Sequence, residues 1–267
     1  MSQFPPEAAP PPYVPPPSEA PLKEFIVLTW RAPLQWFRLG WGDLKAQPAI
    51  SLFYGMAFWF MSAALGAVFR AKPEFTMTLT SGCLLVGPFL ALGLYDVSRR
   101  REQGLQPGFA ASLTCWRNHL RSMGMLVGVL IVLELLWGRA SLVVIALFFN
   151  TGMPSSVSVV EAVFNPGNLD FVLAYMVVGG IFAVLVFAIA VVSIPMILDR
   201  DTDAISAAIT SLEVVVNSTG VMLLWGVMIV ALIAASLLVP WSVGLLVIGP
   251  LLGHASWHAY RGTVRWL

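Results

Sequence analysis

Six apolar runs, each close to or longer than the roughly 20 residues that a helix needs to cross a bilayer, constrain this chain more than any other feature. They predict transmembrane helices at about residues 49–69, 76–97, 123–149, 169–198, 219–239 and 241–260. The composition agrees, because 58% of the residues are hydrophobic and only 11% are charged, whereas about a quarter of the residues of soluble domains are charged. The sequence therefore predicts an all-α polytopic membrane protein whose main partner is the lipid bilayer.

The basic residues predict how this protein is oriented. Of the 15 Lys and Arg residues, only Arg70 and Lys72 lie on one side of the predicted membrane, and Arg139 lies in or near the end of the third run. The others lie on the opposite side: Lys23, Arg31, Arg38, Lys45, Arg99, Arg100, Arg101, Arg117, Arg121, Arg200, Arg261 and Arg265. Because cytoplasmic segments carry an excess of Lys and Arg, we expect both termini to be cytoplasmic, in a multi-pass protein of a bacterial inner membrane.

The N-terminal segment differs in composition from the rest of the chain. Nine prolines fall within residues 1–21, and such a segment lacks the apolar content to pack. We predict a disordered, proline-rich cytoplasmic tail over residues 1–24, followed by a transmembrane domain over residues 25–267.

An internal repeat is visible in the second helix of each predicted hairpin. Gly87-Pro88 in the second run is matched by Gly249-Pro250 in the sixth, and the fourth run contains Pro195. A shorter segment precedes each hairpin: residues 36–45, 111–118 and 210–217. Trp and Arg interleave in the first of these segments, as is typical of a helix at the lipid headgroups. The pattern predicts three hairpin repeats, each preceded by a cytoplasmic interfacial helix.

Several short motifs resemble those of a known bacterial family. Trp41-Gly42-Asp43, Pro48, Ser51-Leu52-Phe53-Tyr54-Gly55, Gly87-Pro88-Phe89, Gly93-Leu94-Tyr95 and Ser98-Arg99 are similar to a family of predicted multi-spanning integral membrane proteins of unknown function. The resemblance runs from about residue 39 to residue 260. Some members are labelled cytochrome c oxidase subunits, which implies a respiratory complex as a conceivable partner. The chain has three histidines in all, too few for a haem-copper catalytic subunit, so it could only accompany such an enzyme.

Glu134 is the first candidate for a functional residue, because it lies about midway along the third run, with Arg139 five residues later. A charge in hydrocarbon costs at least about 2.5–3.5 kcal/mol, so charged groups there usually face a bundle interior or water and mark function. Glu134 and Arg139 are therefore possible transport or ion-pair residues. The alternative is that both lie close to the outer headgroups, with Arg139 extended toward them.

His254 and His258 lie four residues apart and share a helical face near the cytoplasmic boundary. This spacing could hold one metal ion, but it lacks the further ligands of a stable site. We therefore predict an interfacial pair that packs with Trp257 and Tyr260, and neither a metal nor a cofactor.

Acidic residues interrupt the basic cytoplasmic side at two places. Asp96 precedes Arg99 and Arg100 at helical pairing distance, and Asp199-Arg200-Asp201-Thr202-Asp203 follows the fourth run. Asp96, Arg99, Asp199 and Asp203 are possible inter-repeat charge contacts, and Asp201 or Asp203 could also cap the next helix.

The chain lacks the signatures of common enzymes, since no glycine-rich phosphate loop, Gly-x-Ser-x-Gly, His-Glu-x-x-His or Cys-x-x-Cys motif is present. We expect a non-enzymatic accessory, assembly or structural component, without catalytic residues and without nucleic acid as a partner. The alternatives are a small transporter or channel that uses Glu134, and an accessory subunit of a respiratory oxidase.

Overall fold

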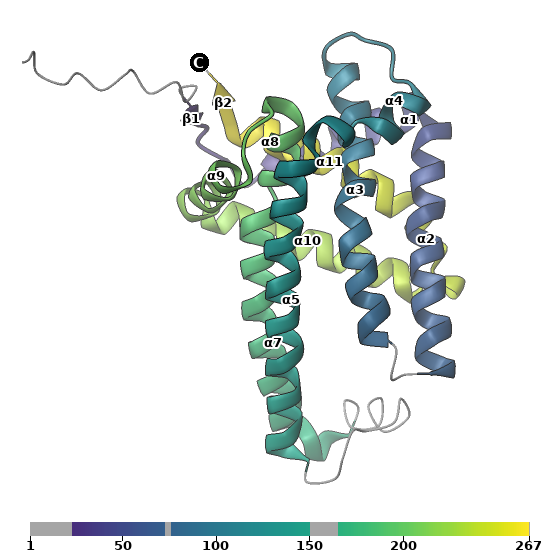
Figure 1. Cartoon of the computed structure of the whole chain (residues 1–267), viewed down its shortest axis with the longest axis vertical. Coiled ribbons are helices and arrows are strands. Elements are labelled where there is room, and N and C mark those ends of the chain that lie inside the picture. The colour runs from purple at the N-terminus through teal and green to yellow at the C-terminus, as the bar shows by residue number, and fades with distance from the viewer. Residues whose placement is uncertain (1–22, 73–75, 150–164, 267) are drawn as a thin grey trace, which may run out of the picture.

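Four long helices run along the longest dimension of the molecule (Figure 1). The computed structural model describes residues 23–72, 76–149 and 165–266, so residues 1–22 of the predicted tail lie outside the described part. The four helices are α2 (Pro48–Ala71), α3 (Thr76–Glu102), α5 (Leu120–Phe148) and α7 (Leu169–Ala190). They contain 22 to 29 residues, which at about 1.5 Å per residue spans a hydrocarbon core about 30 Å thick.

Length and apolarity support part of the predicted topology. Within the described residues, four segments are long and apolar enough to cross a membrane: Pro48–Ala71, Phe109–Phe148, Leu169–Arg200 and Thr219–Leu238. The all-α class is confirmed, whereas the six-span hairpin repeat is not, because α11 (Leu245–Thr263) is absent from this set. The second half of α11 carries His254, His258 and Arg261, which make it too polar.

The predicted fourth helix is broken into two. α7 ends at Ala190 and α8 (Ser193–Arg200) begins after Val191 and Val192. Pro195 explains the break, since its ring conflicts with the carbonyl four residues earlier. Ser211 satisfies backbone groups at the break: its hydroxyl donates to the carbonyl of Ala188 (2.6 Å) and accepts from the amide of Val192 (3.1 Å).

Short helices precede each of the three pairs of longer helices. They are α1 (Ala32–Ala46), α4 (Phe109–Thr114) with the 3₁₀ turn η2 (Arg117–His119), and α9 (Ala204–Asn217). α9 exposes an apolar stripe at helical spacing, made of Ile205, Ile209, Leu212 and Val216. An amphipathic helix with such a stripe is typical of the headgroup boundary of a membrane.

The last pair of helices is oriented differently from the others. α10 (Thr219–Leu238) and α11 run across the long helices (Figure 1), joined by the 3₁₀ turn η4 (Pro240–Ser242). The indole of Trp59 donates to the carbonyl of Trp241 over 2.8 Å, and Trp59 lies midway along α2. The α10–α11 turn is therefore level with the middle of α2 and not with its far end.

Two three-residue strands join the ends of the described chain. β1 (Lys23–Phe25) pairs antiparallel with β2 (Val264–Trp266). Neither strand was predicted, because three residues are too few to show an alternating pattern. The pairing brings residue 23 and residue 266 to the same end of the molecule.

The core lies at that same end, around α11. Its largest fully buried side chains include Trp225, Trp257 and Tyr260, and Trp36 contacts Trp225 edge-on at 5.7 Å between ring centroids. α11 also approaches two helices closely at glycines: a Cβ on Gly55 would meet the carbonyl oxygen of Leu246, and one on Gly40 would lie 2.6 Å from the amide nitrogen of Ala255. This packing holds α1, α2 and α11 together.

Candidate functional site

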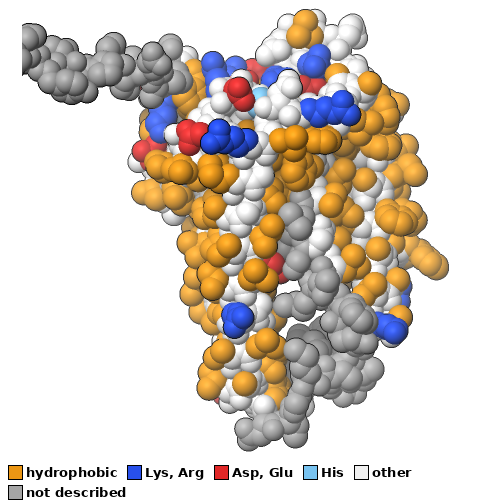
Figure 2. Space-filling model, viewed as in Figure 1, with side chains coloured by type: hydrophobic (Ala, Val, Ile, Leu, Met, Phe, Trp, Pro, Cys, Tyr) orange, Lys and Arg blue, Asp and Glu red, His pale blue; other side chains and the backbone are white. Residues whose placement is uncertain are grey.

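Charged side chains gather at the end of the molecule that carries α1, α8, α9 and the C-terminal half of α11, hereafter the charged end (Figure 2). Most of the predicted site residues lie there, and Glu134 and Arg139 lie apart from them on α5. Two candidate sites therefore exist: a polar network at the charged end and a cavity beside Glu134.

His254 is fully buried between two serines. Its Nε2 lies 2.9 Å from Oγ of Ser51 on α2, and its Nδ1 lies 2.8 Å from Oγ of Ser98 on α3. Ser51 donates its own proton to the carbonyl of Gln47 (2.8 Å). A neutral imidazole that carries its proton on Nε2 satisfies all three bonds, donating to Ser51 and accepting from Ser98. The role of His254 is thus to bridge α2 and α3.

His258 has a different partner, the buried carboxylate of Asp43 on α1. Its Nε2 lies 2.8 Å from Oδ2 of Asp43, whose other oxygen pairs with Arg101. Burial raises the pKa of Asp43, but the hydrogen bond and the charge interaction with His258 lower it, and the net pKa is below 3.8. Since each histidine ring bonds to its own protein partner, the pair does not converge on a metal ion, and the described residues contain no cluster of three or more metal-binding side chains.

Asp43 was missed as a site residue, although it lies in one of the motifs quoted for the family resemblance. The available signal was that Asp43 is the one acid between Arg31 and Lys45. Its partners are far away in the sequence, so no local spacing could have identified them.

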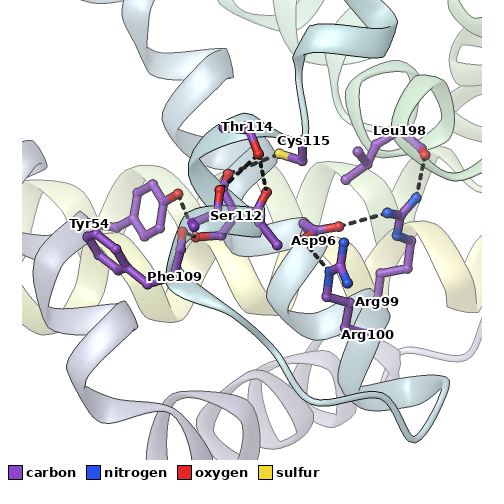
Figure 3. Close-up of polar contacts among 11 residues, drawn as sticks. Tyr54, Asp96, Arg99, Arg100, Phe109, Ser112, Thr114, Cys115 and Leu198 are labelled. Atoms are coloured by element: carbon purple, nitrogen blue, oxygen red, sulfur yellow. Dashed lines mark hydrogen bonds and ion pairs between the residues drawn. The ribbon is translucent and has the colours of Figure 1, made fainter.

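Asp96 lies at the centre of a second cluster (Figure 3). Its side chain is fully buried and accepts from Arg99 and Arg100, at 2.7 Å each. Arg99 also donates to the carbonyl of Leu198 in α8 over 2.7 Å. The structure thus brings Asp96 and Arg99 together within α3, and Arg99 connects α3 to the end of α8.

Tyr54 makes a further connection in the same region (Figure 3). Its hydroxyl donates to Oγ of Ser112 over 3.2 Å, which links α2 to α4. The thiol of Cys115 donates to the carbonyl of Ser112 (3.1 Å), and both Cys83 and Cys115 are free thiols.

Asp199 and Glu102 connect α8 and α3 to the end of α11. Asp199 accepts from the hydroxyl of Tyr260 (2.8 Å) and lies 3.6 Å from the guanidinium of Arg261. Glu102 accepts from the indole of Trp257 (2.9 Å) and from Arg261 (3.0 Å). Asp199 therefore joins α8 to α11, two helices of different predicted repeats.

Asp203 makes no ion pair among the described residues and takes the other role considered for it, that of a helix cap. Its side chain caps α9, accepting from the amides of Ile205 (3.0 Å) and Ser206 (2.9 Å). Hydrogen bonds from Ser206 lower the pKa of Asp203. Its neighbour Asp201 contacts a residue far away in the sequence, since its Oδ1 lies 2.9 Å from Nδ1 of His119.

A cavity of about 410 Å³ separates α3 from α5 and α7, and Glu134 lines it. The other lining residues are Cys83, Gly87, Pro88, Leu130, Leu133, Trp137, Gly179, Phe182, Ala183, Val186, Ala190 and Ile194. Arg139 is exposed and is not among them, so the structure does not bring Glu134 and Arg139 together across this cavity.

These features define the class: an α-helical integral membrane protein with several apolar helices. Residues 75–199 match the model of a family described as "Predicted integral membrane protein (DUF2189)". This match, from α3 to the end of α8, confirms the predicted resemblance to membrane proteins of unknown function. The comparisons with curated proteins and with solved structures found no match.

Proposed function

We propose that the protein is a non-enzymatic accessory, assembly or structural component of a bacterial inner membrane, working through its charged end. The observation that carries this proposal is how the ionisable side chains there are used. Asp43, Asp96, Glu102 and Asp199 each bond to side chains on their own or another helix. Groups held in this way stabilise a rigid surface, and none of them is left poised as a nucleophile beside a base.

Exposed cations on that surface supply the contacts to partners. Arg31, Arg38, Lys45, Arg117 and Arg121 are exposed, and they fit the acidic headgroups of the cytoplasmic leaflet or an acidic partner protein. We propose that the charged end, with both termini, is cytoplasmic. The pairing of β1 with β2 supports the same side for both ends of the described chain, and the excess of Lys and Arg favours the cytoplasm.

We also propose three hairpin repeats, of which the third does not cross the membrane completely. The repeat is supported by the short helix before each pair and by prolines Pro88, Pro195 and Pro250 in α3, α8 and α11. The hydrogen bond between Trp59 and Trp241 favours a shallower third hairpin. α10 and α11 would enter from the charged end and return without reaching the far side.

Site-specific crosslinking in living cells tests the function. A photoreactive amino acid at Arg117 or Arg121 should yield discrete crosslinked polypeptides, which mass spectrometry identifies. The control position is Leu147, which is 75% exposed near the other end of α5 and should crosslink only to lipid. Absence of any polypeptide product from both arginine positions would contradict the proposal.

A transporter or channel is the second candidate, favoured by the position of Glu134 in a cavity. The apolar lining argues against a hydrated ion path, because ions in transit need polar ligands or water. Ion flux measured with purified protein in liposomes decides between the two functions. A flux that is lost in Glu134→Gln would favour transport. A flux that persists in that variant would exclude Glu134 as its path.

The respiratory alternative is tested by purification in mild detergent. An oxidase accessory subunit should copurify with haem that is visible in the absorption spectrum and with oxidase peptides. The residues of this chain give haem little support, since His119, His254 and His258 already bond to Asp201, two serines and Asp43. A preparation without haem and without oxidase peptides removes this candidate.

A further inference from the structure

The cavity beside Glu134 combines features that the proposed function does not use. Glu134 is residue 15 of the 29 in α5, counted from Leu120, so the cavity lies near the middle of the membrane-spanning part. Its volume of about 410 Å³ lies within the range of about 300–1,000 Å³ that holds drug-sized molecules. Its walls come from four helices: Gly87 and Pro88 on α3, Trp137 on α5, Phe182 on α7 and Ile194 on α8.

Among the described residues, Glu134 has no partner in this cavity. No hydrogen bond or ion pair connects it to another residue in the described ranges, and it is the one acidic or basic side chain among the residues that line the cavity. A charge at this depth costs at least about 2.5–3.5 kcal/mol. A ligand that brings the opposite charge offsets this cost.

The aromatic rings beside Glu134 favour the same kind of ligand. The rings of Trp137 and Phe182 are 5.9 Å apart between centroids, and both line the cavity. Trp137 can lie against the backbone of α7 because residue 179 is a glycine, where a Cβ would be only 3.0 Å from the indole. Aromatic faces attract cations, most strongly where water is excluded.

The surface beside the cavity is apolar, which suits a ligand that arrives through the bilayer. Side chains next to the lining residues are exposed on the outside of the bundle, among them Leu135 at 60% and Ile181 at 56%. These apolar side chains face the acyl chains of the lipid, so a molecule dissolved in the membrane meets this part of α5 and α7 first.

We propose that this cavity binds a lipophilic organic cation, with Glu134 as counter-charge and Trp137 and Phe182 against the cationic group. This inference is independent of the role proposed for the charged end. The cavity is the binding site, and α3 closes it on the side opposite α5 and α7.

Equilibrium binding of radiolabelled tetraphenylphosphonium tests this proposal on the full chain in nanodiscs of zwitterionic lipid. The wild type should bind saturably, about one cation per chain. Glu134→Gln, which keeps the shape of the side chain, should weaken binding at least tenfold. Ala183→Phe, which fills the cavity, should do the same. The matched control is Asp170→Asn, an exposed acid in the first turn of α7, which should bind as the wild type does.

Two further measurements make the result decisive. Each variant is checked for monodispersity and for its melting temperature, so that loss of binding is scored only in folded protein. If Ala183→Phe misfolds, the result for Glu134→Gln alone decides. Neutral triphenylphosphine oxide should not compete with the cation. Undiminished binding by Glu134→Gln, equal competition by the neutral compound, or no saturable binding by the wild type would overturn the proposal. Each of these failures leaves the crosslinking result at the charged end unaffected.

Discussion

At the residue scale, the chain uses its buried polar groups to join helices. Asp96 pairs with Arg99 and Arg100, a contact that helical spacing alone predicted, because residues three and four apart face each other. Asp43 needs Arg101 and His258, which are 58 and 215 residues away in the sequence. Such partners follow from tertiary packing, so the sequence could identify the first contact and not the second.

Replacement of Asp43 by asparagine should destabilise the fold at neutral pH and lose this effect in acid. The variant leaves Arg101 and His258 without their charged acceptor, which we expect to cost about 1–3 kcal/mol. The pKa of Asp43 in the folded protein is below its usual value of 3.8. Its carboxylate therefore stabilises the fold at pH values above 3.8, and this stabilisation is lost as the pH falls through the folded-state pKa.

The measurement is the free energy of unfolding in detergent for the wild type and Asp43→Asn from pH 7 to pH 3. The difference between the two proteins should be largest near neutral pH and should shrink below pH 4. Asp170→Asn removes an exposed acid and should show little difference at any pH. A difference for Asp43→Asn that stayed constant down to pH 3 would refute the linkage.

At the scale of elements, hydropathy predicted where long helices lie but neither their breaks nor their depth. The predicted runs 49–69 and 123–149 correspond to α2 (Pro48–Ala71) and α5 (Leu120–Phe148). The break between α7 and α8 falls at two valines, which are as apolar as their neighbours, so hydropathy does not reveal it, and the signal in the sequence is Pro195. The crossing of α10 and α11 over the other helices depends on close contacts that hydropathy does not report.

Gly55 makes one of these close contacts, so Gly55→Ala should push α2 and α11 apart. The added methyl group would collide with the carbonyl of Leu246, and helix backbones cannot yield as a flexible side chain would. We expect a loss of about 1–3 kcal/mol, measured as the free energy of unfolding in detergent. Gly128→Ala in α5 is the matched control, because nothing lies within 4 Å of a Cβ there, and alanine should stabilise that helix by about 0.5–1 kcal/mol. Equal effects of the two substitutions would show that the contact is unimportant.

At the scale of the whole molecule, the last pair of long helices lies across the other two pairs and not along them (Figure 1). Two pairs of helices, α2 with α3 and α5 with α7, extend from the charged end toward the opposite end of the molecule. α10 and α11 pass across them (Figure 1). Much of the buried core is gathered around α11. The six apolar runs could not predict this arrangement, because a helix that crosses a membrane and one that packs inside a helical bundle can share the same composition.

Cysteine labelling in intact cells distinguishes a shallow third hairpin from a complete crossing. Cys83 and Cys115 are first replaced by alanine, and single cysteines are then placed at Ala71, Arg117 or Ser242. Ala71, at the end of α2, should react with a membrane-impermeant maleimide added from outside, and Arg117 should react only in inverted vesicles. Ser242 follows Trp241, which bonds to the middle of α2, so its cysteine should react from neither side until detergent dissolves the membrane. Labelling of Ser242→Cys from outside, at the rate of Ala71→Cys, would mean that α10 and α11 cross completely and that the three hairpins are equivalent.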